Sequence, residues 1–214
     1  NPRLVLSRTA SDALPPPAGG DPEGLLRTGR TQELLAATEG APAGRRGALH
    51  GHALAVTGQV EEGCALLAAS AAATPDDALV QVLYGRVLLV LARDAKDDPM
   101  RLTLEALRQL DRSEGGVQEG DDGLWAAGIR GRLRAAVPPF FQQREAAIRD
   151  LRAALEGLDA RTAPPDQGSR RLEGLVALTL GGLAADRDLL ARAEAVDPEG
   201  EIGRRARGKL EEVG

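Results

Sequence analysis

Two histidines, the only ones in the chain, lie two residues apart at His50 and His52. Paired imidazoles can bind a metal ion or move a proton, provided that their ring nitrogens converge. Residues two apart on a helix point to nearly opposite sides, so these two rings cannot share one metal ion on a helical segment. The pair is therefore predicted to be one exposed and one half-buried histidine, with no metal site.

Adjacent carboxylates are the other groups that could carry acid–base or metal chemistry. They form four pairs: Glu61–Glu62, Asp76–Asp77, Asp97–Asp98 and Asp121–Asp122. Each pair falls at an expected helix start or in a loop, where the positive end of the helix dipole stabilises negative charge. The segment DAKDD, residues 94–98, lacks the ligand spacing and the glycine of a calcium-binding loop. We therefore expect capping or solvated carboxylates, with no catalytic residue and no cofactor.

The chain has one cysteine, Cys64, so it can form neither an internal disulfide nor a thiolate zinc cluster. Cys64 lies on the apolar stripe of an expected helix, where a free cysteine behaves as a small buried hydrophobe. The net charge of −5 argues against a nucleic-acid or anionic-membrane partner, because both attract a basic surface. Aromatic residues make up only 2% of the chain, which argues against stacking on bases or sugars.

Residues 1–20, NPRLVLSRTASDALPPPAGG, have no helical period, and their three consecutive prolines favour an extended conformation. We expect a tail held by the chain's own surface or by a neighbouring protein, because ordering it costs roughly 1–2 kcal/mol per residue. Met100 is the only methionine, so the sequence lacks an initiator. Removal of a signal peptide would explain this and favours the cell envelope, the periplasm or secretion over the cytoplasm. A fragment of a longer chain explains the same observation.

Helical periodicity, which must position all of these groups, runs through nearly the whole chain from Asp21 onward. The clearest segment is ALVQVLYGRVLLVLA at 78–92. It is apolar on both sides, so the helix is either buried on two sides or faces a partner. It is too short, and too often interrupted by polar residues, to span a bilayer. No segment alternates as a strand would. Further helices are expected at 46–57, 60–73, 99–112, 124–136, 139–158, 168–182, 185–196 and 200–212.

Two stretches of this helical pattern, residues 44–77 and 167–200, run in step. In each, a glycine precedes two aliphatic residues and a proline by 2, 9 and 17 residues: Gly58 with Val60, Leu67 and Pro75, and Gly181 with Leu183, Leu190 and Pro198. A further glycine, Gly51 or Gly174, stands seven residues earlier. The earlier glycine allows a close helix crossing, the later one supplies a turn, and the proline ends the second helix. The pattern predicts a helical hairpin of about 34 residues.

These residues resemble the tetratricopeptide repeat (TPR) family. The resemblance rests on Gly51, Leu54, Gly58, Val60, Leu67, Ser70 and Pro75 in one unit, and on Gly174, Ala177, Gly181, Leu183, Leu190, Ala193 and Pro198 in the other. Aliphatic residues stand at the family's usual aromatic positions. The resemblance implies an all-α fold, a right-handed superhelical array of antiparallel helix pairs. Residues 21–214 would form one array, with interrupted units at about 78–112 and 124–158 and a capping helix at 200–212.

The same resemblance implies a concave groove lined by the first helices of successive hairpins. The residues that it projects towards this groove are Arg45, His52, Leu79, Val82, Arg86, Val90, Trp125, Ile129 and Arg132. Their mixture of aliphatic, arginine and tryptophan side chains suits a peptide or helix of another protein. The alternative is that the aliphatic members pack against the neighbouring hairpin.

A non-enzymatic scaffold or adaptor, which holds a partner protein in a larger assembly, is therefore the expected function. The expectation includes neither a nucleic-acid partner nor a membrane span. The alternative is a regulatory or accessory domain cut from a longer enzyme, or from a secretion or envelope component.

Overall fold

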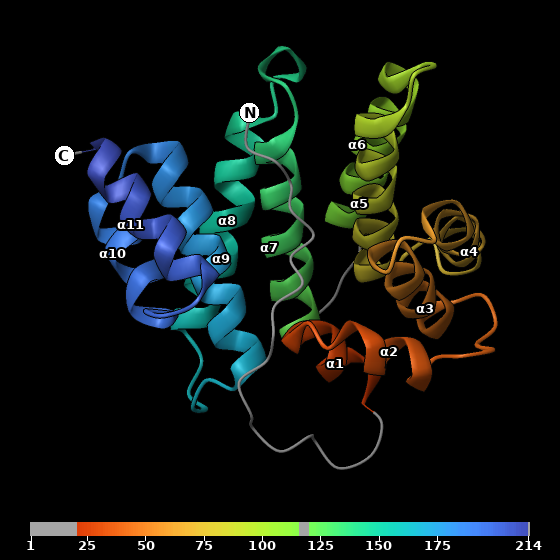
Figure 1. Cartoon of the computed structure of the whole chain (residues 1–214), viewed down its shortest axis with the longest axis horizontal. Helices are drawn as coiled ribbons and strands as arrows, with labels where there is room; N and C mark the ends of the chain where they lie inside the picture. The colour runs from red at the N-terminus through yellow and green to blue at the C-terminus, as the bar shows by residue number, and fades with distance from the viewer. Residues whose placement is uncertain (1–20, 116–119, 214) are drawn as a thin grey trace. The chain divides into compact units, whose positions relative to one another are not determined.

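The computed structural model describes residues 21–115 and 120–213, so the predicted tail of residues 1–20 lies outside the described residues. Within the described part every regular element is helical, which confirms the all-α prediction (Figure 1). The α-helices are α1 (Pro22–Thr28), α2 (Thr31–Ala37), α3 (Arg45–Val56), α4 (Val60–Ala73), α5 (Ala78–Asp94), α6 (Pro99–Gly115), α7 (Asp121–Ala136), α8 (Arg144–Asp159), α9 (Gln167–Ala184), α10 (Arg187–Val196) and α11 (Glu201–Val213), and a short 3-10 helix, η1, covers Pro139–Phe141.

Capping residues explain where several of these helices begin and end. Asp21 accepts a hydrogen bond from the backbone N–H of Glu23 at 3.1 Å, and Gly29 ends α1 in the left-handed region at φ 76°. Asp77 and Asp186 cap α5 and α10 in the same way. Asp77 belongs to one of the four acidic pairs, and its role as a cap agrees with the sequence prediction for that pair.

Consecutive helices pack as antiparallel pairs: α3 with α4, α5 with α6, α7 with α8, and α9 with α10. The contacts of α3 and α4 show the direction, because Gly51 lies against Gly63 whereas Gly47, one turn earlier, lies against Ser70, two turns later. Short connections between helices produce this arrangement. Packed helix pairs are therefore a property of the described structure.

The crossing of α3 and α4 brings two backbones into contact. A Cβ atom placed on Gly51 would lie 2.8 Å from the carbonyl oxygen of Gly63, and one placed on Gly63 would lie 2.4 Å from the carbonyl oxygen of Gly51. Real Cβ atoms do not approach oxygen so closely, so only glycine fits both positions. The close crossing predicted at Gly51 is present.

The equivalent positions in the later hairpin behave differently from the expectation. Gly174 faces side chains of Val196 and Ile202, and a Cβ there would lie 3.2 Å and 3.3 Å from their nearest atoms. Gly181 lies inside α9 rather than in a turn, against Leu190 of α10. The turn falls at Ala185, which takes a left-handed φ of 53°. Helix α9 continues past Gly181 because a glycine permits a turn but does not require one.

A second boundary also differs from the sequence reading. The helix expected at 139–158 begins only at Arg144, and the residues before it form η1. Gln142 has a φ of 56°, a left-handed conformation that interrupts the helical hydrogen bonding. The two adjacent prolines before Phe140 start the 3-10 turn but do not extend it into α8.

The chain divides into two compact units, with the boundary between residues 119 and 120. In the first unit the buried side chains come mainly from α3, α4, α5 and α6. In the second, Ala177, Leu178, Leu190, Ala193 and Ala206 form a buried cluster. Ile202 and Leu210 of α11 pack against that cluster, as a helix that caps the second unit would. The single array expected over 21–214 stays a prediction.

Helix length and hydropathy also address the membrane question. Among the described residues, no helix is both long enough and apolar enough to cross a bilayer.

Gly51→Ala and Gly174→Ala provide a matched test of the crossing, since the two glycines hold the same place in the sequence repeat. Alanine at Gly51 meets a carbonyl oxygen of the opposing backbone, so we expect a loss of about 1–3 kcal/mol in the free energy of unfolding. Alanine at Gly174 meets only side chains that can shift, and its helix propensity offsets up to about 1 kcal/mol. Urea denaturation followed by circular dichroism measures both. Equal stabilities would contradict the backbone contact.

Candidate functional site

The nine predicted groove residues fall in both units, and most of them are buried. Those with exposed fractions of 9% or less are His52, Leu79, Val82, Val90, Trp125 and Ile129. The three arginines, Arg45, Arg86 and Arg132, are half-buried. The first unit holds the candidates up to Val90 and the second holds the rest. Within each unit the aliphatic candidates are therefore covered in the structure, and the arginines are the accessible members.

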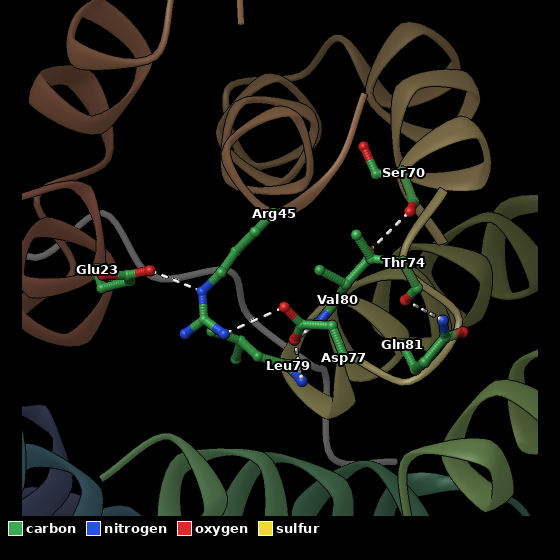
Figure 2. Close-up of polar contacts among 8 residues, drawn as sticks. All are labelled: Glu23, Arg45, Ser70, Thr74, Asp77, Leu79, Val80 and Gln81. Carbon is green, nitrogen blue, oxygen red and sulfur yellow. Dashed lines mark hydrogen bonds and ion pairs between the residues drawn. The ribbon is translucent and has the colours of Figure 1, made fainter. Parts of the chain in front are cut away.

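Arg45, at the start of α3, joins three helices through two carboxylates (Figure 2). Its Nε donates to Oε1 of Glu23 on α1 at 2.7 Å, and its Nη1 donates to Oδ2 of Asp77 at 3.1 Å. The other oxygen of Asp77 accepts the backbone N–H groups of Leu79 and Val80 at 3.1 Å and 3.2 Å. One carboxylate thus caps α5 and pairs with Arg45. Arg45 has an intramolecular role that the sequence reading did not anticipate.

Beside this network, a buried side-chain amide donates to carbonyl groups at the end of α4 (Figure 2). Nε2 of Gln81 lies 3.2 Å, 3.3 Å and 3.2 Å from the carbonyl oxygens of Ala71, Thr74 and Pro75. Carbonyl groups in the last turn of a helix lack intrahelical donors, so a buried amide there stabilises the helix end. Gln81, one of the polar residues interrupting 78–92, is thus explained by a structural role.

A second charged cluster lies in the other unit, where Asp150 of α8 accepts hydrogen bonds from two arginines of α7. Nη2 of Arg130 lies 2.6 Å from Oδ1 and Nη1 of Arg134 lies 2.8 Å from Oδ2. The side chains of Arg134 and Asp150 are only 2% and 8% exposed. Removing one partner from such a buried pair is strongly destabilising. Sequence reasoning missed this cluster, because Arg130 and Arg134 lie on one helix and Asp150 on another, so only tertiary packing brings them together.

Nucleophilic chemistry at the cysteine is disfavoured by its surroundings. Cys64 is half-buried on α4, and burial followed by the charge of Glu61 raises the pKa of its thiol. The thiolate is the reactive form, so its population falls. Among the described residues, no group of three or more His, Cys, Asp or Glu side chains is placed to hold a metal ion.

Comparison with known proteins gives no assignment. No family model, no curated protein and no solved structure matches this chain. The function must therefore be inferred from the residues and geometry of this chain alone.

Two surface depressions remain as places for a ligand. One, of about 240 Å³, lies among α8, α9 and α10, but two of its acidic residues already have roles. Asp159 pairs with Arg192, whose hydrogen bond lowers the pKa of that carboxyl, and Asp186 caps α10. Its acidic rim is therefore partly neutralised.

The other depression, of about 360 Å³, lies between α2 and α3. Its lining residues are Gln32, Leu35, Ala36, Glu39, His50 and Leu54. His50 is half-buried here, whereas His52 is 5% exposed, so neither histidine is the fully exposed one that the sequence led us to expect. Sequence reasoning missed this site because its two sides come from separate helices with no shared motif.

Asp150→Asn tests the buried cluster. The substitution preserves shape but removes the charge that offsets two guanidinium groups, so we expect a loss of about 3–5 kcal/mol in the stability of the second unit. Asp159→Asn is the control, because Asp159 is 54% exposed and its pair with Arg192 is worth at most about 1 kcal/mol. Chemical denaturation of both variants provides the comparison. A small loss for Asp150→Asn would show that the cluster is not a stabilising element.

Proposed function

We propose that this protein is a non-enzymatic scaffold or adaptor, which binds another protein through a TPR-like helical-hairpin array. The observation that carries the proposal is the succession of antiparallel helix pairs, with the α3–α4 crossing made by two opposed glycines. Such pairs build a core only with their neighbours, and stacking them exposes extended surfaces that suit peptide or helix ligands. The right-handed superhelix and the concave groove are part of the proposal.

The proposed partner lies along the first helices of the hairpins, where the nine candidate residues occur. The half-buried arginines offer charged contact points. The aliphatic candidates either belong to the core or form a face that a partner contacts once the neighbouring helices that now cover it move away.

Isolation of the native protein under mild crosslinking, followed by reconstitution with the purified associate, tests the proposal. We expect a complex of fixed stoichiometry that forms in calorimetry without turnover of either component. A well-folded chain that forms no complex with any crosslinked associate after purification would refute the scaffold role.

Val82→Asp decides between core and groove for the aliphatic candidates. The side chain of Val82 is 0% exposed, so we expect the aspartate to cost several kcal/mol and to unfold the first unit. Leu104→Asp on α6 is the control, because Leu104 is 43% exposed and should tolerate the change within about 0.5 kcal/mol. Circular dichroism melts report folding, and calorimetry with the reconstituted partner reports binding.

Two other outcomes for Val82→Asp carry information. A folded variant that no longer binds would assign Val82 to the groove. A folded variant that binds normally would contradict both the core and the groove interpretation.

A further inference from the structure

The depression between α2 and α3 is lined by apolar side chains and by side chains that can accept hydrogen bonds. Leu35 and Leu54 are apolar, and Gln32, Glu39 and His50 are the polar lining residues. No arginine or lysine is among the lining residues. A site of this composition suits a ligand with an apolar stem and a cationic, donor-rich head.

The proton on His50 is located by its neighbour Thr38. The Thr38 hydroxyl donates to the carbonyl oxygen of Leu34 at 2.6 Å. The hydroxyl oxygen of Thr38 also lies 3.0 Å from Nδ1 of His50. A hydroxyl has one hydrogen, and the short 2.6 Å separation assigns it to the carbonyl oxygen of Leu34, which leaves the Thr38 oxygen as the acceptor for His50. Nδ1 therefore carries the proton in the neutral ring, and Nε2 carries the lone pair.

Nε2 is thereby left as an acceptor on a residue that lines the depression. Thr38 is fully buried and fixes the ring from the α2 side, so the orientation of the imidazole is set by packing as well as by one hydrogen bond. Among the described residues, the bond to Thr38 is the polar contact made by the His50 side chain. The lining residues thus include an imidazole that can accept a hydrogen bond and a carboxylate.

The one acidic side chain among the lining residues of the depression is a carboxylate that can pair with a cation. Glu39 lines the depression and is exposed. The nearest arginine along α3, Arg46, donates from Nη2 to the carbonyl oxygen of Ala37 at 2.6 Å, and it is not among the lining residues. Glu39 is thus the carboxylate among the lining residues, and the guanidinium of Arg46 is held on the carbonyl of Ala37, two residues before Glu39.

We propose that the depression between α2 and α3 binds an arginine side chain of a partner protein, whose guanidinium donates to Nε2 of His50 and pairs with Glu39. The planar guanidinium presents several donors at once, and its methylene stem can lie over Leu35 and Leu54. This inference rests on the proposed protein-binding function and gives it a specific contact. The contact lies outside the nine groove candidates.

The first test observes the imidazole nitrogens of the full-length, ¹⁵N-labelled protein by NMR at about pH 8, where an ordinary histidine is neutral. We expect His50 to show a protonated Nδ1 and an acceptor Nε2. A protonated Nε2 on His50 would overturn the proposal.

The second test titrates the same sample with Nα-acetyl-arginine amide, and with the uncharged citrulline analogue as the matched control. We expect saturable shifts of His50 Nε2 with a Kd on the order of millimolar, as for one weak contact. Citrulline should bind at least tenfold more weakly, and His52 serves as an internal reference that should not shift. Equal binding of the two probes, or a response of His50 to inorganic phosphate alone, would refute cation recognition.

Two variants assign the contacts. His50→Phe keeps an aromatic ring but removes the acceptor, and should weaken arginine binding at least tenfold while the circular dichroism spectrum is retained. Should that variant misfold, Glu39→Gln on the exposed rim gives the answer, because it should reduce the preference for arginine over citrulline. Unchanged binding and preference in both variants would overturn the proposal.

The outcomes also separate this site from the proposed function. If a partner protein binds and its affinity is unaffected by His50→Phe and Glu39→Gln, the scaffold role stands and the arginine site falls. If the capped arginine binds at His50 and no partner forms a complex, the scaffold role falls, and the depression stands as a cation site without a partner protein.

Discussion

Direct contact between the backbones of α3 and α4 is the constraint on which the first unit depends. With no side chain at Gly51 or Gly63, the separation of the two helices is set by main-chain atoms, which cannot adjust as a core of flexible side chains can. The fixed hairpin then places Ser70, whose hydroxyl accepts the backbone N–H of Gly44 at the start of α3. The entry to α3 and the exit of α4 are held together by this crossing.

Carboxylates at the helix ends and between helices add polar contacts to the packing that the small residues allow. A chain with 2% aromatic content has few large side chains to fill space, and much of its packing relies on alanine, leucine and glycine. Asp77 and Asp150 each take two interactions at once, the first with a helix end and Arg45, the second with two arginines of α7. Buried charges of this kind contribute geometry more than net stability, because their desolvation offsets much of the attraction.

Sequence periodicity predicted the helices and the crossing at Gly51, since both follow from local chemistry. It could not locate the turn at Ala185 or the start of α8, because glycine and proline restrict a helix without dictating its last residue. The apolar pattern of α5 predicted either burial on two sides or a face towards a partner, because periodicity does not say what covers a face. His50 and Thr38 are twelve residues apart on different helices, so their hydrogen bond follows only from tertiary packing.

The division into two units has a spectroscopic consequence. Trp125, the only tryptophan, is buried in the second unit, whereas Tyr84, the only tyrosine, lies on α5 of the first. Tryptophan fluorescence therefore reports the unfolding of the second unit alone, while far-ultraviolet circular dichroism averages over both. Noncoincident transitions would mean that each unit melts independently, and coincident ones would mean that the two halves of the chain share their cooperativity.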